Sequence, residues 1–189
     1  DGLKHVHWKT AARTGELVVR EFEDEFFVRQ ALVLDTDLGQ QNPVLFEAAV
    51  SIAASYLSSV PTREAILDLI FSREKLFDFP SGRSLLSHSV LLKTLACVQP
   101  STEPAIRELS QHLAMTGNRF SGAICIFLSW TGHHRAILEH FRRHQVPVLA
   151  ILVTDHPRRD QRKTRAACDD HIRIKVVAPD RIVQRLGQP

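Results

Sequence analysis

Two long apolar runs in the second half of the sequence most constrain the fold of this chain. The runs are AICIFLS at residues 123–129 and VPVLAILV at residues 146–153, and neither alternates between apolar and polar residues. Continuous apolar strands are typical of parallel sheets that are covered on both faces. Between the two runs, Ile137, Leu138 and Phe141 fall on one side of a predicted helix. This order of strand, helix and strand indicates a βαβ unit.

The first half of the sequence continues the same alternation. Residues 27–34 are strand-like, and a helix is predicted from about Pro43 to Ser59, with Asn42 as its N-cap. Residues 65–71 and 75–79 predict a hairpin. The remaining predictions are helices near residues 84–97, 103–115 and 179–186, and strands at residues 16–23 and 171–177.

Together these elements predict a single α/β domain that spans residues 1–189. Its central sheet is expected to be mostly parallel with helices on both faces, so the fold class is doubly wound and Rossmann-like. Ligands on such sheets bind at the carboxyl ends of strands, where the strand order reverses. The loops that follow residues 27–34 and 123–129 are therefore the expected site.

Composition and cysteine spacing limit the classes of partner and cofactor. The net charge is only +3, which is too small to argue for a nucleic-acid partner. No apolar run approaches the ~20 residues that a membrane span needs. Cys97, Cys125 and Cys168 are far apart and form no Cys-x-x-Cys pair, so we expect reduced, packed thiols.

Residues 32–40, LVLDTDLGQ, place two carboxylates at the end of a predicted strand. Asp35 and Asp37 would supply oxygen ligands of the kind that Mg²⁺ or Mn²⁺ takes. The alternative interpretation is the polar end of a buried strand, which needs no cofactor.

Three blocks of sequence point to a known family. HVHWKTAARTGELVVREFEDEF at residues 5–26 contains an aromatic-Lys pair, an Ala-Arg pair, Gly-Glu-Leu and Arg-Glu-Phe-Glu in order, and LFEAAVSIAAS and LLKTLACVQPS follow. In these blocks the chain resembles the bacterial proteins grouped as domain of unknown function 58, whereas its last third matches only in pattern. The resemblance implies a von Willebrand factor A-like fold and, as partner, a MoxR-type AAA+ ATPase or its client complexes.

The resemblance also implies a metal-ion-dependent adhesion site, in which no bond is made or broken. In that superfamily an Asp-x-Ser-x-Ser loop, a Thr from a second loop and an Asp from a third loop hold one divalent cation. Asp35 matches the first Asp, whereas Asp37 and Gly39 replace the two serines. Thr102 matches the second-loop Thr. The implied metal ligands are therefore Asp35, Asp37 and Thr102, in a degenerate site.

The third loop departs most from the pattern. Trp130 follows the predicted strand at 123–129 with Thr131 behind it, and neither carries a carboxylate. A large aromatic side chain can supply interface energy instead, so exchanging Trp130 for Ala is expected to weaken partner binding and to leave folding intact. The expected partner-binding rim consists of the loops at residues 35–42, 100–104 and 129–134, with Asp35, Asp37, Thr102, Trp130, Thr131 and His133 as its residues.

Two histidines and one serine near this rim allow other interpretations. His133 and His134 follow a predicted strand-to-helix turn and are candidates for a pH-sensitive or partner-contacting role, or only for an exposed first helical turn. Ser129, His133 and Asp155 form a hydrolase-like trio, but their order matches no known pattern. We predict a non-enzymatic interaction module. A cation-dependent adhesion domain and a hydrolase that uses Ser129 are the alternatives.

The segment HPRRDQRKTR at residues 156–165 concentrates basic side chains. Such a run is typical of a solvated helix face, and the alternative is attraction to anionic lipid headgroups. The latter would suit a C-terminal part of a longer, membrane-anchored protein. The expected location is the cytoplasm or the cytoplasmic face of the inner membrane.

Overall fold

The structure is a computed structural model, and it describes residues 28–39, 42–60, 65–72, 76–79, 88–101, 105–116 and 119–180. Several predictions lie outside these described residues. They are the strand at 16–23, the family-like block at 5–26, Thr102 and the closing helix beyond residue 180.

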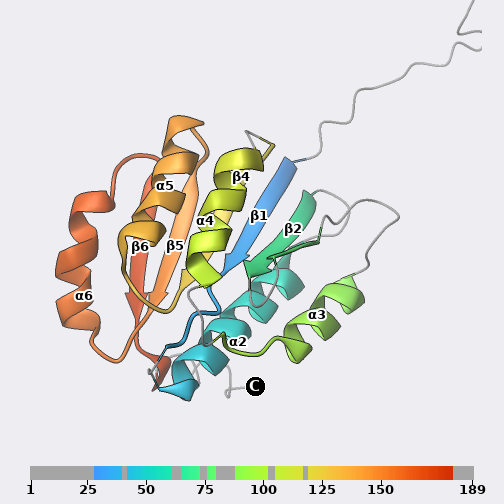
Figure 1. Cartoon of the computed structure of the whole chain (residues 1–189), viewed down its shortest axis with the longest axis horizontal. Helices are drawn as coiled ribbons and strands as arrows, with labels where there is room; N and C mark the ends of the chain where they lie inside the picture. The colour runs from blue at the N-terminus through green and yellow to red at the C-terminus, as the bar shows by residue number, and fades with distance from the viewer. Residues whose placement is uncertain are drawn as a thin grey trace, which may run out of the picture.

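A six-stranded sheet forms the centre of the molecule, in the strand order β3-β2-β1-β4-β5-β6 (Figure 1). All neighbouring strands are parallel except the edge pair β2 and β3, which is antiparallel. The predicted hairpin and the predicted α/β class are thus confirmed. The strands are β1 (Val28–Leu34), β2 (Ala65–Ser72), β3 (Leu76–Phe79), β4 (Gly122–Phe127), β5 (Val148–Val153) and β6 (Ile172–Val177).

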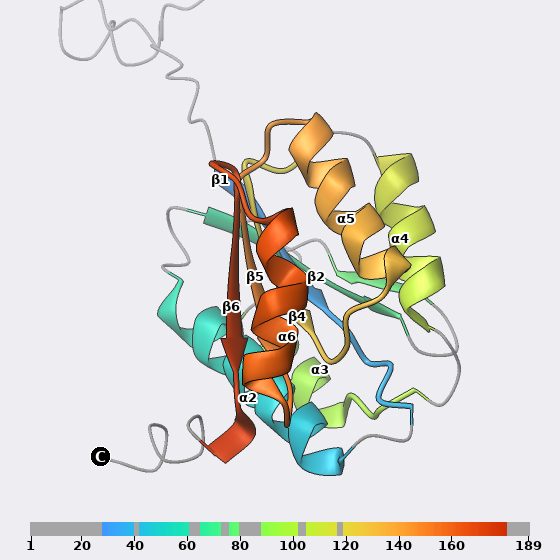
Figure 2. The same ribbon diagram turned by 90° about the vertical axis from the view of Figure 1, so that its left-hand side faces the viewer.

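Helices cover both faces of the sheet (Figure 2). On one face lie α2 (Pro43–Ser59) and α3 (His88–Cys97). On the other face lie α4 (Ala105–Thr116), α5 (Gly132–Arg143) and α6 (Pro157–Thr164), and a 3-10 turn, η2 (Arg165–Ala167), continues α6. None of the helices in these described ranges has the length and apolar character that a membrane span requires.

Each face of the sheet has its own hydrophobic core, and β1 contributes to both. Ala31 and Val33 lie in the cluster shared with α4 and α5, and Leu32 and Leu34 lie in the cluster shared with α2 and α3. All four side chains are 0% exposed. Successive residues of a strand point to opposite faces, so a strand that is covered twice must be apolar at every position. This accounts for the unbroken apolar runs in the sequence.

The order of the strands determines where a site can form. From β1 the chain continues to β2 on one side, and it later returns to pair β4 with the other side of β1. The carboxyl ends of β1 and β4 therefore lie side by side at the point where the strand order reverses, where ligands bind in doubly wound folds. The loops after Leu34 and Phe127 start at this point.

Candidate functional site

Two of the three expected loops meet directly at the end of β1. The backbone N–H of Ser101 donates to the carbonyl of Thr36 at 2.7 Å, and Asp37 and Ser101 form an isolated parallel bridge. The turn that follows contains Gly39, whose φ of +57° lies in the left-handed region. Glycine adopts this region without the steric cost of a Cβ. The residue that stands in place of a metal-binding serine thus has a backbone role.

Asp35 is the most deeply buried carboxylate of the site, at 1% exposure. Its Oδ1 accepts a hydrogen bond from the backbone N–H of Asp37 at 2.9 Å. Its Oδ2 accepts from the backbone N–H of Leu128 at 3.0 Å and also lies 3.0 Å from Nε2 of His134. Both oxygens of Asp35 are therefore engaged by groups of the protein itself, which connects the ends of β1, β4 and α5.

His134 completes this arrangement from the first turn of α5, where its side chain is 0% exposed. Its Nδ1 lies 3.1 Å from the backbone nitrogen and 2.8 Å from Oγ1 of Thr131, the N-cap of α5. A backbone N–H can only donate, so Nδ1 must accept and the proton must reside on Nε2. The neutral imidazole then donates from Nε2 to Asp35.

The imidazole of His134 is also held by an aromatic contact. Its centroid lies 4.7 Å from that of Phe127, the last residue of β4, with the rings at 75° to each other. An edge-to-face contact of this kind is the favoured geometry for two aromatic rings. The orientation of the ring is thus determined by Phe127, Thr131 and Asp35 together.

The prediction that His133 and His134 share an exposed first helical turn is wrong for His134. His133 is exposed, whereas His134 is buried, because consecutive helical residues point in different directions and only His134 faces β1. The available sequence signal was the spacing of Thr131 and His134. The side chain at this spacing can bond back to the N–H of an N-cap, as in a capping box.

Asp37 presents its carboxylate at the rim and is half-buried. Desolvation by burial, and then the neighbouring Asp35 carboxylate, raise the pKa of Asp37 above its usual value. Among the described residues, no hydrogen bond or ion pair to this carboxylate is formed. Asp37 is therefore the acidic group of the rim that remains available to a partner or a cation.

Trp130 and its neighbours form the outer surface of the rim. Trp130 is half-buried, packs against the core on the α4 and α5 side and lies 6.5 Å from Phe127 between ring centroids. The expectation that removing this side chain would leave folding intact therefore needs correction, because core contacts would be lost. Thr131 and His133 are exposed.

Several of the residues matched to the implied metal site have other roles or lack a ligand atom. Asp35 already uses both oxygens, Gly39 has no side chain, and Trp130 and Thr131 stand in place of the third-loop Asp. The described part of the chain contains no group of three or more His, Cys, Asp or Glu side chains that could hold a metal ion. Mg²⁺ or Mn²⁺ at Asp35, Asp37 and Thr102 stays a prediction.

The hydrolase-like trio is not connected by hydrogen bonds. Within the described residues, Ser129, His133 and Asp155 form none with one another. The histidine that the fold buries beside a carboxylate is His134, and its partner is Asp35. The three residues carry no nucleophile–base contact of the kind that marks an activated serine.

No protein-family model and no curated protein matches this chain. Solved structures do match. Proximal thread matrix protein 1 from the mussel byssus, with a zinc-occupied MIDAS motif, has a TM-score of 0.58 and 11% identity over 84% of this chain and 43% of its own. The manganese-loaded TRAP protein of Plasmodium vivax has a TM-score of 0.57 and 10% identity over 84% of this chain and 71% of its own.

In a third solved structure, the match covers nearly the whole of the other chain. The SpRpn10 VWA domain has a TM-score of 0.54 and 11% identity, over 85% of this chain and 95% of its own. This chain thus spans less than half of the mussel protein but nearly all of an isolated VWA domain. At these identities the likeness concerns the fold alone, and that fold is the von Willebrand factor A-like α/β fold.

Proposed function

We propose that this chain is a non-enzymatic protein–protein interaction module that binds its partner through the rim at the ends of β1 and β4. The observation that carries the proposal is the pair of Asp35 and His134. A buried carboxylate must be compensated, and here a neutral histidine and two backbone amides do so. The rim is then shaped without help from a cation.

The exposed part of the rim supplies groups that a protein partner can contact. Asp37 offers a carboxylate, His133 an exposed imidazole, and Trp130 the accessible part of a large aromatic side chain. Aromatic residues surrounded by polar groups are typical of interface hot spots. The VWA-like fold supports this proposal as an analogy only, because a fold does not determine a function.

For the partner, we propose a MoxR-type AAA+ ATPase or one of its client complexes, with assembly or maturation of protein complexes as the process. This part of the proposal rests on the resemblance of the sequence blocks. With such a partner, the proposed location of the chain is the cytoplasm or the cytoplasmic face of the inner membrane.

Thermal unfolding tests whether the rim works without metal. We would measure the midpoint for the wild type and for Asp37→Ala with EDTA, with Mg²⁺ and with Mn²⁺. Asp37→Ala is a better test than Asp35→Ala, because Asp35 is buried and replacing Asp35 would itself destabilise the fold. A ligand that binds only the native state raises its stability, so we expect the same midpoint in all three buffers. If Mg²⁺ or Mn²⁺ raises the unfolding midpoint of the wild type but not that of Asp37→Ala, the result would favour the cation-dependent adhesion domain.

Binding to a purified MoxR-type ATPase tests the partner and the surface. Such an ATPase itself needs Mg²⁺ and nucleotide, so chelation cannot be used here and variants must replace it. We expect His133→Ala to weaken binding about tenfold, the effect of losing a moderate hot-spot side chain. His171→Ala is the matched control, because His171 is also exposed but lies at the amino end of β6, whereas the rim lies at the carboxyl ends of β1 and β4. Equal binding by both variants and the wild type would argue against the rim.

A further inference from the structure

The side chains that helix α6 buries are polar rather than apolar. Its buried residues are Asp160 and Thr164. Oγ1 of Thr154, just after β5, donates to Oδ2 of Asp160 at 2.7 Å, and Oγ1 of Thr164 donates to the carbonyl of Asp160 at 3.1 Å. Packing against the sheet thus does not account for the exposed charged side chains of α6.

Asp160 forms ion pairs with two of the five basic residues of this segment. Arg159 Nε and Lys163 Nζ each lie 3.4 Å from Asp160 Oδ1. Burial by itself would raise the pKa of Asp160, but hydrogen bonds from Thr154, Lys163 and Arg159 outweigh it and lower the pKa below 3.8. These two cations thus belong to the structural contacts of α6.

The other three basic residues line one open pocket of about 490 Å³. Arg158, Arg162 and Arg165 are exposed, and within the described part of the chain no ion pair is formed by any of them. Their spacing of four and three residues places them on one face of the helix. Like charges at this spacing repel one another, and an anion bound among them would remove that repulsion. Gln161, Thr164, Cys168 and Ile174 complete the lining.

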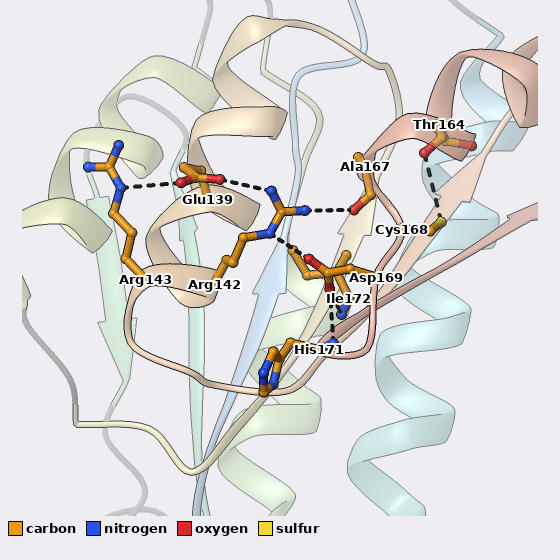
Figure 3. Close-up of polar contacts among 9 residues, drawn as sticks. All are labelled: Glu139, Arg142, Arg143, Thr164, Ala167, Cys168, Asp169, His171 and Ile172. Atoms are coloured by element: carbon orange, nitrogen blue, oxygen red, sulfur yellow. Dashed lines mark hydrogen bonds and ion pairs between the residues drawn. The ribbon is translucent and has the colours of Figure 1, made fainter.

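The turn after α6, which brings Cys168 to the pocket, is held by the contacts drawn in Figure 3. Cys168 Sγ donates to the carbonyl of Thr164 at 3.8 Å. Arg142 of α5 donates to the carbonyl of Ala167 at 3.2 Å and pairs with Asp169 at 2.7 Å. Asp169 in turn accepts from the backbone N–H of Ile172 at 2.7 Å. The turn between α6 and β6 is therefore anchored on both sides, which fixes the position of Cys168 beside α6.

We propose that this pocket binds the phosphoryl group of a phosphorylated side chain in a partner protein segment. A phosphomonoester carries a charge of about −1.5 to −2 at neutral pH, which matches three unpaired guanidinium groups better than a single carboxylate does. Arginine also binds phosphate oxygens through paired, charge-assisted hydrogen bonds. Ile174, which packs against the core, provides an apolar floor for the stem of the side chain.

The charge of the surrounding segment favours a protein ligand over a lipid surface. Residues 155–170 contain five basic side chains, but also Asp155, Asp160, Asp169 and Asp170. Non-specific attraction to an anionic membrane grows with the positive charge near its surface, and these acidic neighbours reduce that charge. Recognition here depends instead on three guanidinium groups along one side of one open pocket. This site is separate from the rim at Asp37 and His133.

An NMR titration of the full chain tests the proposal. The probes are acetylated pentapeptides with two glycines on each side of phosphoserine, of serine or of glutamate, at constant ionic strength. We expect only the phosphoserine peptide to shift the side-chain Nε–Hε signals of Arg158, Arg162 and Arg165. We expect Arg162→Gln to weaken its binding about tenfold, as for the loss of one charge-assisted pair of hydrogen bonds. Arg107→Gln, an exposed arginine on α4, removes the same charge and should have no effect.

A second readout uses the thiol in the pocket. The phosphoserine peptide should slow alkylation of Cys168 at least severalfold and leave Cys97, exposed on α3, unchanged. Equal binding of the glutamate peptide, or of inorganic phosphate, would overturn the proposal. Binding only to phosphatidylserine vesicles, lost in Arg162→Gln, would reassign the pocket to lipid headgroups. Absence of any shift at millimolar peptide would also overturn it, and none of these results depends on the rim.

Discussion

His134 Nε2 lies 3.0 Å from Asp35 Oδ2, and both side chains are 0% exposed. The two residues are far apart in the sequence. Asp35 follows the last residue of β1, and His134 lies in the first turn of α5. Because Nδ1 accepts from Thr131, the pair consists of a neutral imidazole and a carboxylate. This contact joins the end of β1 to the first turn of α5.

Replacing His134 with Ala should destabilise the protein. The substitution removes one of the hydrogen bonds to a buried carboxylate and the aromatic contact with Phe127. Loss of a hydrogen bond to a buried charge and of packed volume costs about 3 kcal/mol in the free energy of unfolding. Urea unfolding measures the change. The adjacent His133→Ala should stay within about 0.5 kcal/mol of the wild type, as is usual for exposed positions.

Replacing Trp130 with Ala should affect both stability and partner binding. The half-buried indole packs against Phe127 and the core, so we expect a loss of about 2 kcal/mol, less than for a fully buried aromatic residue. Trp130→Phe keeps most of that packing and serves as the control. If partner binding falls with Trp130→Phe while the unfolding midpoint does not, the indole itself contacts the partner. Unchanged partner capture by both variants would remove Trp130 from the interface.

Asp160→Asn should reveal a pH-dependent contribution of α6 to stability. The pKa of Asp160 is lower in the native state than its ordinary value of 3.8. Its stabilising effect is therefore complete above pH 3.8 and is lost as the pH falls through the native pKa. We expect Asp160→Asn to cost about 0.5–1 kcal/mol at pH 7, since its ionic partners are largely exposed. Urea unfolding should show this difference vanishing at low pH. Asp155→Asn is the control, because Asp155 is an exposed neighbour that forms no ion pair with the other described residues.

The three thiols should differ sharply in reactivity. Burial raises the pKa of Cys125 far above its usual range, and the side chain is 0% exposed in β4. Because the thiolate is the reactive species, N-ethylmaleimide should modify Cys97 and Cys168 in the native protein and Cys125 only after unfolding. Mass spectrometry counts the adducts. Rapid labelling of Cys125 under native conditions would show that β4 opens easily.

Local patterns in the sequence determined most of the secondary structure. Asn42 and Pro43 begin α2, with the Asn42 side chain accepting from the N–H of Val44 at 3.0 Å, and the helix ends at Ser59 as predicted. The continuous apolar runs became β4 and β5, and the alternating run became the edge strand β6. These features depend on neighbouring residues, on capping groups and on how many faces of a strand are covered, all of which can be read along the chain.

Only the tertiary structure decided what the polar residues do. The sequence shows Asp35 as a candidate metal ligand and His134 as one of two adjacent histidines, but the contact between them forms because β1 and β4 pair and α5 begins beside them. Likewise, the basic run at residues 156–165 divides into cations paired with Asp160 and arginines that line a pocket only once α6 packs beside β6. The partner of a polar side chain is set by residues distant in sequence, and local periodicity contains no information about them.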